Sequence, residues 1–119
     1  MSTKVRFRTR IYRDEVIAIG PGKVALLEAI ATEGSISAAA RKLGMSYRRA
    51  WLLLDAMNTV LKSPAVATAT GGSRGGGASI TPTGEAIIKH YRSLEAKAEE
   101  AAADDIAALM HLLVNTPAH

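Results

Sequence analysis

Residues 36–55, which read ISAAARKLGMSYRRAWLLLD, constrain the fold more than any other part of this sequence. They predict two helices joined by a tight turn at Gly44, because glycine accepts the positive φ that such a turn favours. Small or apolar residues recur where the two helices of a helix-turn-helix would pack together. These residues are Ala39, Ala40, Leu43, Met45, Ala50 and Leu53. An ordinary helical hairpin with solvated arginines is the alternative interpretation.

The start of the second helix carries hydrogen-bonding and cationic side chains at its outward positions. This pattern suits a helix that enters the DNA major groove. The predicted base-contacting residues are Ser46, Tyr47, Arg48 and Arg49. Backbone amides at the start of the preceding helix can also bind a phosphate. The candidates for phosphate contact around that helix are its possible caps Ser35 and Ser37, together with Arg41 and Lys42.

Composition and charge agree with a nucleic-acid-binding domain. The 119 residues suffice for one compact domain plus at most one further element. Residues 1–62 contain eleven Lys/Arg against five Asp/Glu, whereas residues 63–119 contain four against six. The basic half thus coincides with the helix-turn-helix. The sequence has no cysteine, no signal peptide and no apolar run near the ~20 residues of a membrane span, so we expect a cytoplasmic protein. A generic basic protein is the alternative.

The segments before and within the helix-turn-helix carry further local signals. Residues 4–12 alternate between apolar residues and arginines, which predicts a half-buried strand. A helix follows the Gly-Pro-Gly at 20–22 and ends at Gly34. Ser46 caps the third helix, over 46–62, which Pro64 stops. The buried face of that helix is predicted to comprise Ala50, Leu53, Leu54, Met57, Val60 and Leu61.

Residues 65–81 predict a two-stranded wing. Val66–Thr70 alternates like a strand, 71–77 is glycine-rich, and Ser79–Thr81 resembles the return strand. Arg74 is the only charge in the loop, and we expect it to contact a minor groove or phosphates. A nucleotide-phosphate loop is one alternative, but the lysine and Ser/Thr of that motif are missing. A flexible linker is the other.

The last helix begins at Pro82, with Thr81 as its cap, and is expected to extend to about Val114. Asp104 or Asp105 could cap a separate final helix. An apolar face of this length predicts dimerisation through the helix, although its first turns would pack on their own core. The predicted dimer contacts are Tyr91, Leu94, Ala98, Ile106, Leu109 and Leu113.

No motif for enzymatic chemistry or metal binding is recognisable. The three histidines, His90, His111 and His119, are not spaced as a ligand set, and no nucleophile motif brings serine and histidine together. The acidic pair at 104–105 is a better helix cap than a magnesium site. We therefore expect no catalytic residues, no metal and no cofactor.

Three segments together resemble the DNA-binding domain of the ModE family of molybdate-responsive bacterial regulators, which is related to the winged helix of LysR-type regulators. They are GSISAAARKLGMSYRRAW at 34–51, ATATGGSRGGGASITPTGEAII at 67–88 and IGPGKVALLEAI at 19–30. The resemblance implies a dimeric winged helix that binds palindromic DNA and usually represses. Full-length family members continue into C-terminal oxyanion-binding domains, whereas this sequence ends at His119. Binding of molybdate by this chain is thus not expected.

The sequence as a whole predicts a mainly α fold with a small β component. Residues 1–81 would form the winged helix-turn-helix domain, with the helix-turn-helix at 36–55 and the wing at 65–81. Residues 82–119 would form a C-terminal dimerisation helix. The predicted function is a homodimeric transcription regulator, a repressor, whose partner is double-stranded DNA and which does not contact a membrane. Two alternatives remain: a molybdate-responsive regulator that uses a separate sensor, and a winged-helix adaptor whose arginines meet an acidic protein.

Overall fold

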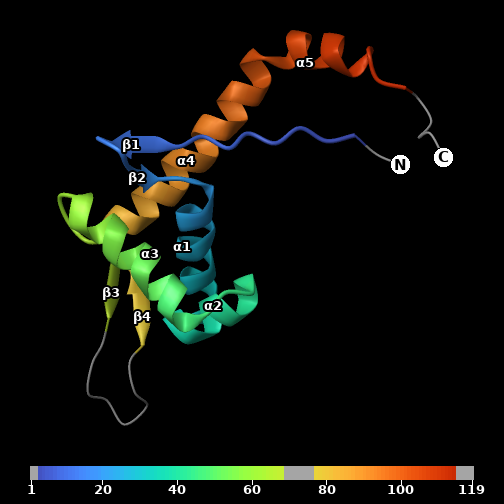
Figure 1. Cartoon of the computed structure of the whole chain (residues 1–119). Helices are drawn as coiled ribbons and strands as arrows, with labels where there is room; N and C mark the ends of the chain where they lie inside the picture. The colour runs from blue at the N-terminus through green and yellow to red at the C-terminus, as the bar shows by residue number, and fades with distance from the viewer. Residues whose placement is uncertain (1–2, 69–76, 115–119) are drawn as a thin grey trace.

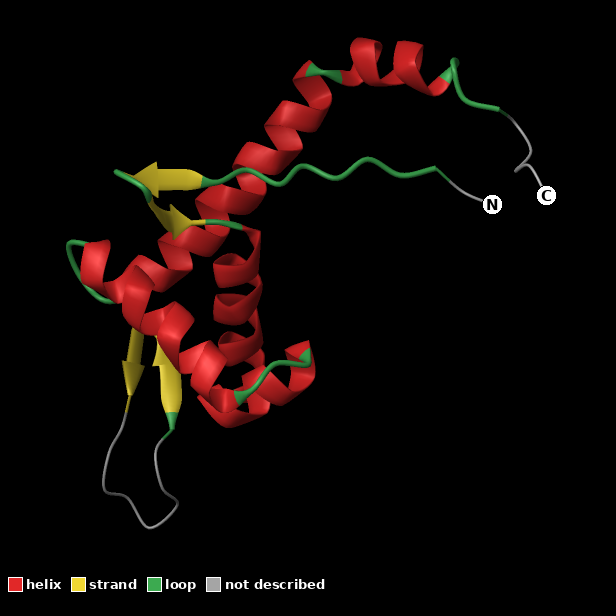
Figure 2. Ribbon diagram, viewed as in Figure 1, coloured by secondary structure: helices red, strands yellow, loops and turns green. Residues whose placement is uncertain are grey.

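A computed structural model of the chain describes residues 3–68 and 77–114. These residues form helices and short strands that surround a central helix, α1 (Figure 1). In chain order the elements are β1 (Ile11–Arg13), β2 (Val16–Ile19), α1 (Pro21–Glu33), α2 (Ile36–Leu43), α3 (Tyr47–Val60), β3 (Val66–Thr68), β4 (Ala78–Ile80), α4 (Pro82–Ala101) and α5 (Ala103–Met110). The prediction of a mainly α fold with a small β component is confirmed, as Figure 2 shows.

The hydrophobic core lies where α1, α2 and α3 meet. Leu26, Leu27 and Ile30 of α1 are almost fully buried, and so is Met57 of α3. Pro21 stands in the first turn of α1, where its missing N–H costs nothing, and Gly34 ends the helix in the left-handed region with φ 78°. Each fully buried aliphatic side chain contributes about 1.5–3 kcal/mol. This core therefore fixes the positions of α2 and α3 relative to α1.

The helix-turn-helix is formed as the sequence predicts. Gly44 has φ 70°, and its backbone N–H donates to the last carbonyls of α2. Ala39, Ala40 and Ala50 are buried between the two helices. Leu43 differs from the prediction: it lies in the last turn of α2 and remains 37 % exposed. Met45 and Leu53 are partly buried against the core.

The N-terminal segment differs from the predicted strand over 4–12. Residues 3–10 have no regular secondary structure, and the pairing begins only at β1, which forms an antiparallel hairpin with β2. Asp14 makes the turn with φ 56°, a conformation that aspartate tolerates better than most residues. Lys23 of α1 is buried and donates its ammonium to the Ile17 carbonyl, which fastens the hairpin to α1. Burial lowers the pKa of Lys23.

The two strands of the predicted wing are present: β3 covers the described part of the predicted 66–70, and β4 is as long as the predicted 79–81 but begins one residue earlier. β3 and β4 pair antiparallel, with Val66 opposite Ile80 and Thr68 opposite Ala78. The glycine loop between them, including Arg74, lies outside the described residues.

The predicted single helix from Pro82 to about Val114 is two helices. α4 ends at Ala101, the chain turns at Ala102, and α5 begins at Ala103. The break thus precedes the acidic pair: Asp104 and Asp105 occupy the first turn of α5, where their charge complements the helix dipole, and neither caps it. Within the described ranges no helix combines the length and the apolar character needed to span a membrane.

The start of α4 is closely packed on the residues that precede β3. Thr81 caps α4 by accepting from the Gly84 N–H, and its hydroxyl donates to the Pro64 carbonyl at 2.6 Å. A Cβ atom at Gly84 would lie 2.3 Å from the carbonyl oxygen of Ala65. Only glycine fits this position without a shift of the backbone.

Arg92 of α4 is joined to Glu28 of α1. Its Nε donates to one Glu28 oxygen at 2.9 Å and its Nη2 to the other, while Nη1 pairs with Glu95 at 2.6 Å. The hydrogen bonds from Arg92 lower the pKa of the Glu28 carboxyl. This bidentate pair helps to set the direction in which α4 leaves the core.

Glu28→Gln is expected to lower the free energy of unfolding by about 0.5 kcal/mol near pH 7, because both partners are partly exposed and screened by solvent. A carboxylate whose pKa is lowered by folding stabilises the fold above its unfolded pKa of about 4.3, and this contribution disappears as the pH falls through the folded value. The difference between wild type and variant should therefore shrink below about pH 4. Urea unfolding at several pH values measures it, and a difference that grows on acidification would contradict the assignment.

Candidate nucleic-acid interface

The first turn of α3 presents polar and cationic side chains to solvent. Ser46 precedes the helix in an extended conformation, and its Oγ accepts a hydrogen bond from the Arg49 N–H at 3.1 Å. Tyr47 is 53 % exposed, and Arg48 and Arg49 are exposed as well. On the opposite side of the helix, Ala50, Leu54 and Met57 are buried. The helix is therefore held by its apolar face, and its N-terminal turn is available to a ligand.

Helix α2 supplies the second group of predicted residues. Ser35 is its cap, with Oγ accepting from the Ala38 N–H at 3.1 Å, whereas Ser37 lies inside the helix and is exposed. Arg41 and Lys42 are exposed in the last turn. Lys42 lies 3.6 Å from a carboxylate oxygen of Glu33, so part of its charge is already balanced.

The base of the wing is tied to the start of α2. The Ala78 N–H of β4 donates to the Gly34 carbonyl at 3.0 Å, and Gly34 is next to the cap Ser35. The wing and the α2 N-terminus are thus neighbours, although Ala78 comes 44 positions after Gly34 in the sequence. In Figure 1 the antiparallel strands β3 and β4 lie at the same end of the molecule at which α3 begins. The structure does not describe Arg74, so its predicted role stays a prediction.

Two exposed apolar residues of α3 are not among the predicted contact residues. Trp51 is 46 % and Leu52 is 47 % exposed. The apolar run Ala50–Leu54 indicates that some of its side chains are exposed, because five consecutive positions of a helix cannot all face one core. Trp51 lines a small hollow between α3 and β3, with Asp55 and Val66 on its rim.

The predicted dimer contacts divide into two groups. Tyr91 is only 3 % exposed, and its hydroxyl donates to the Thr9 carbonyl at 2.7 Å, so its surface is covered by its own chain. This corrects the prediction that Tyr91 faces a partner. Leu94, Leu109 and Leu113 are exposed by 36 %, 64 % and 56 %, while Ala98 and Ile106 are partly buried.

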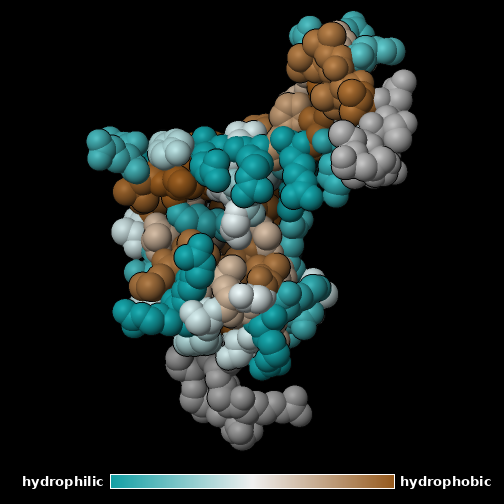
Figure 3. Space-filling view, turned by 45° about the vertical axis from the view of Figure 1, so that its right-hand side comes forward, coloured by the Kyte–Doolittle hydropathy of each residue, from teal (hydrophilic) through white to brown (hydrophobic). Residues whose placement is uncertain are grey.

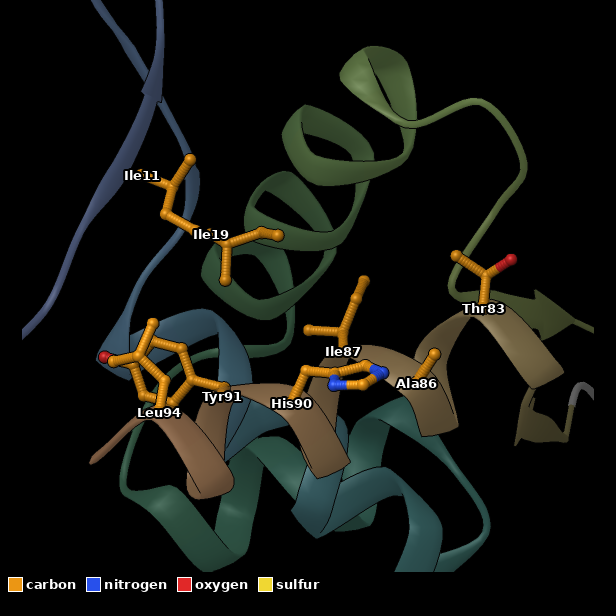
Figure 4. Close-up of a pocket in the computed structure, with 8 residues that line it drawn as sticks. All are labelled: Ile11, Ile19, Thr83, Ala86, Ile87, His90, Tyr91 and Leu94. Atoms are coloured by element: carbon orange, nitrogen blue, oxygen red, sulfur yellow. The ribbon is translucent and has the colours of Figure 1, made fainter. Parts of the chain in front are cut away.

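An apolar hollow of about 330 Å³ lies beside Tyr91, between the β1–β2 hairpin and α4. Figure 4 shows Ile11 and Ile19 of the hairpin on one side and Ile87, His90, Tyr91 and Leu94 of α4 on the other. Within residues 3–68 and 77–114, no group of three or more His, Asp or Glu side chains could hold a metal ion.

Comparison with known proteins now identifies the family. Residues 22–85, which are more than half of the chain, match the model of the bacterial regulatory helix-turn-helix proteins of the lysR family. The chain belongs to this family. The match begins in α1 and ends in the first turn of α4, so it contains the whole helix-turn-helix and wing. That the family is regulatory supports the prediction that the chain is not an enzyme.

The relatives with curated descriptions confirm the resemblance to ModE. The molybdenum-pterin-binding protein MopB of Rhodobacter capsulatus is 53 % identical over 78 residues, which cover 66 % of this chain and 29 % of MopB. The molybdenum transport protein ModE of Azotobacter vinelandii is 39 % identical, over 83 % of this chain and 37 % of ModE. The transcriptional regulator ModE of Yersinia pestis is 37 % identical, over 92 % and 40 %. The chain thus spans well under half the length of these relatives.

A solved structure supports the fold. The DNA-binding domain of CbnR, crystallised in complex with DNA, superimposes with a TM-score of 0.56 at 22 % identity, and the alignment covers 74 % of this chain and 95 % of that domain. At this identity the likeness concerns the fold, and it agrees with the winged helix built above.

Proposed function

We propose that this chain of the LysR family is a sequence-specific DNA-binding transcription regulator. The observation that carries the proposal is the first turn of α3, where Arg48 and Arg49 are exposed beside a cap formed by Ser46 while the other face of the helix is buried. A helix held in this way can enter a major groove with its N-terminal residues toward the bases. Arg48 is the principal reading residue, since it points away from the buried face and arginine can bind guanine through two hydrogen bonds.

Residues around α3 position the helix on the phosphate backbone. Ser35 and Ser37 lie at the N-terminus of α2, where free N–H groups and the helix dipole favour an anion. A serine hydroxyl that accepts a capping bond still has its own hydrogen to donate. Arg41 and Lys42 add positive charge at the other end of α2. Arg74 of the wing loop completes the set, by contact with the minor groove or with phosphates.

The protein acts as a homodimer in this proposal, with residues 1–81 as the DNA-binding domain and 82–119 as the dimerisation part. The support is the exposed apolar surface of α4 and α5. Leu109, Leu112 and Leu113 are 56–81 % exposed, and Figure 3 shows hydrophobic residues gathered over α5. A second copy would cover this surface and the hollow lined by Ile11 and Leu94. Two copies related by a two-fold axis would read two half-sites of a palindrome, and occupancy of such a site would repress transcription.

Arg48→Ala is expected to weaken binding to the preferred duplex by about 1–3 kcal/mol and to relax base preference at one position of each half-site. The measurement is a titration of wild type and variant against a randomised duplex library at two salt concentrations. Affinity should fall steeply with salt for both proteins, because several phosphate contacts remain.

Arg13→Ala is the matched control for charge. Arg13 is an exposed arginine of β1, on the hairpin rather than on the helix-turn-helix, so its loss should leave base preference unchanged. An Arg48→Ala protein that keeps the full preference of the wild type would refute the assignment of the reading residue. A wild type that binds all duplexes equally would favour the adaptor function, in which the arginines contact an acidic protein.

A second candidate function is regulation in response to molybdate through a separate sensor protein. The observation that favours it is that the relatives MopB and ModE are named for molybdenum. Operator affinity of the purified chain should then be the same with and without sodium molybdate, while operator occupancy in cells should change with molybdate supply. If operator occupancy in cells stays the same when the molybdate supply changes, this candidate function is rejected.

A further inference from the structure

We propose that Leu52 reads the methyl group of a thymine in each half-site, one or two base pairs from the base read by Arg48. The inference rests on the proposed function and adds the chemistry of a second base contact. It begins from the exposure of Leu52, which is 47 % exposed in the middle of a helix whose other leucines, Leu53 and Leu54, are partly or fully buried.

The helix geometry places Leu52 on the same face as Arg48. Residues four apart in an α-helix are neighbours on its surface, and this face is opposite the buried Ala50, Leu54 and Met57. A rise of about 6 Å separates positions 48 and 52 along the axis, since each residue adds 1.5 Å. Base pairs are spaced by about 3.4 Å. Contacts from Arg48 and Leu52 would therefore fall on bases one or two pairs apart.

The chemistry of the side chain selects the base. Leucine has no hydrogen-bonding group, and the only apolar group that a base pair presents in the major groove is the C5-methyl of thymine. A single exposed leucine is common on protein surfaces, but here Tyr47 and Trp51 are also about half exposed on the first two turns of α3. Exposed apolar side chains of this kind beside Arg48 and Arg49 favour a contact surface.

Neighbouring residues limit how far the contact extends. Asp55 follows Leu52 by three residues and is exposed, and its carboxylate is unfavourable close to phosphates. Trp51 lies to the side, over the hollow between α3 and β3 that Asp55 and Val66 also line. Leu52 is thus the last residue of α3 that we expect to touch a base, and Trp51 is directed toward the wing.

The test replaces thymines of the bound duplex by deoxyuridine, which lacks only the methyl group. The duplex is first enriched from a randomised pool with the full wild-type chain, and each thymine is then replaced in turn. At one position in each half-site the wild type should lose about fourfold in affinity, the value expected for one methyl group removed from a buried contact. Leu52→Ala should bind the thymine and uracil duplexes equally at that position.

Val16→Ala is the matched control, because Val16 is 49 % exposed but belongs to the β1–β2 hairpin and not to the helix-turn-helix. It should show the same fourfold loss as the wild type. Enrichment of a preferred duplex in which no thymine methyl matters, or a Leu52→Ala protein that still distinguishes thymine from uracil, overturns this inference and leaves the proposed function standing. If no duplex is enriched, the proposed function fails, and the inference fails with it.

Discussion

Gly84→Ala should lower the free energy of unfolding by about 3 kcal/mol, near the upper end of the usual cost of overpacking. The added methyl would lie 2.3 Å from the Ala65 carbonyl oxygen and 2.7 Å from Cγ2 of Ile80. The first contact is with backbone that cannot rotate away, so α4 must move relative to the residues before β3. Urea unfolding followed by circular dichroism measures the effect.

Gly22→Ala is the matched control, since it makes the same change near the start of another helix. Apart from adjoining residues and the nearby backbone of its own helix, no atom lies within 4 Å of the added methyl there, and the backbone of Gly22 is helical. This substitution should be neutral or stabilise by about 0.5–1 kcal/mol, because alanine has less conformational freedom than glycine in the unfolded chain. Equal losses of stability at the two positions would mean that the close approach at Gly84 is not the cause.

Replacement of Leu109 and Leu113 together by glutamate should convert the proposed dimer into monomers at micromolar concentration. Each leucine removed from a buried contact costs about 1.5–3 kcal/mol, and a symmetric dimer loses four. Both side chains are more than half exposed in the single chain, so the fold itself should persist. Sedimentation velocity reports the mass, and circular dichroism reports the helix content.

His111→Glu is the control for the dimer experiment, because it adds charge to the same segment without removing apolar surface. This variant should remain dimeric. Affinity for a palindromic duplex should fall in the double glutamate variant and stay close to wild type in the control. A wild type that sediments as a monomer at micromolar concentration would remove the basis for dimerisation through this surface.

Local signals made the helix-turn-helix predictable from sequence. The side chains of the caps Ser35 and Ser46 accept hydrogen bonds from backbone N–H groups three residues away. Gly44 adopts the positive φ that the turn after α2 needs. The β1–β2 hairpin was missed because its turn residues, Asp14 and Glu15, are not the usual Asn-Gly or Asp-Gly pair. The acidic pair at 104–105 indicated a possible break, but its position at Ala102 could not be predicted, since alanine favours helix on both sides of it.

In the candidate site, too, a feature could be predicted where nearby residues determine it and could not where a distant segment does. Tyr91 has the spacing of a contact residue, but Thr9, which accepts its hydrogen bond, lies 82 residues earlier. No periodicity within α4 could reveal that a distant segment covers this ring. The exposure of Leu52, in contrast, can be predicted from the helix period alone. The apolar run Ala50–Leu54 has five consecutive residues, and these cannot all lie on one buried face of a helix.

The course of residues 3–10 bears on how this domain could be joined to others. Thr3, Lys4 and Val5 share a hollow with Ile106 and Met110 of α5, so the two ends of the described chain lie together. Figure 1 places them at the end of the molecule opposite to the wing strands and the start of α3. A sensor, a reporter or an affinity tag fused at either end would therefore project away from the proposed DNA-binding surface. One linker length should suit both fusions, since the two ends lie close together.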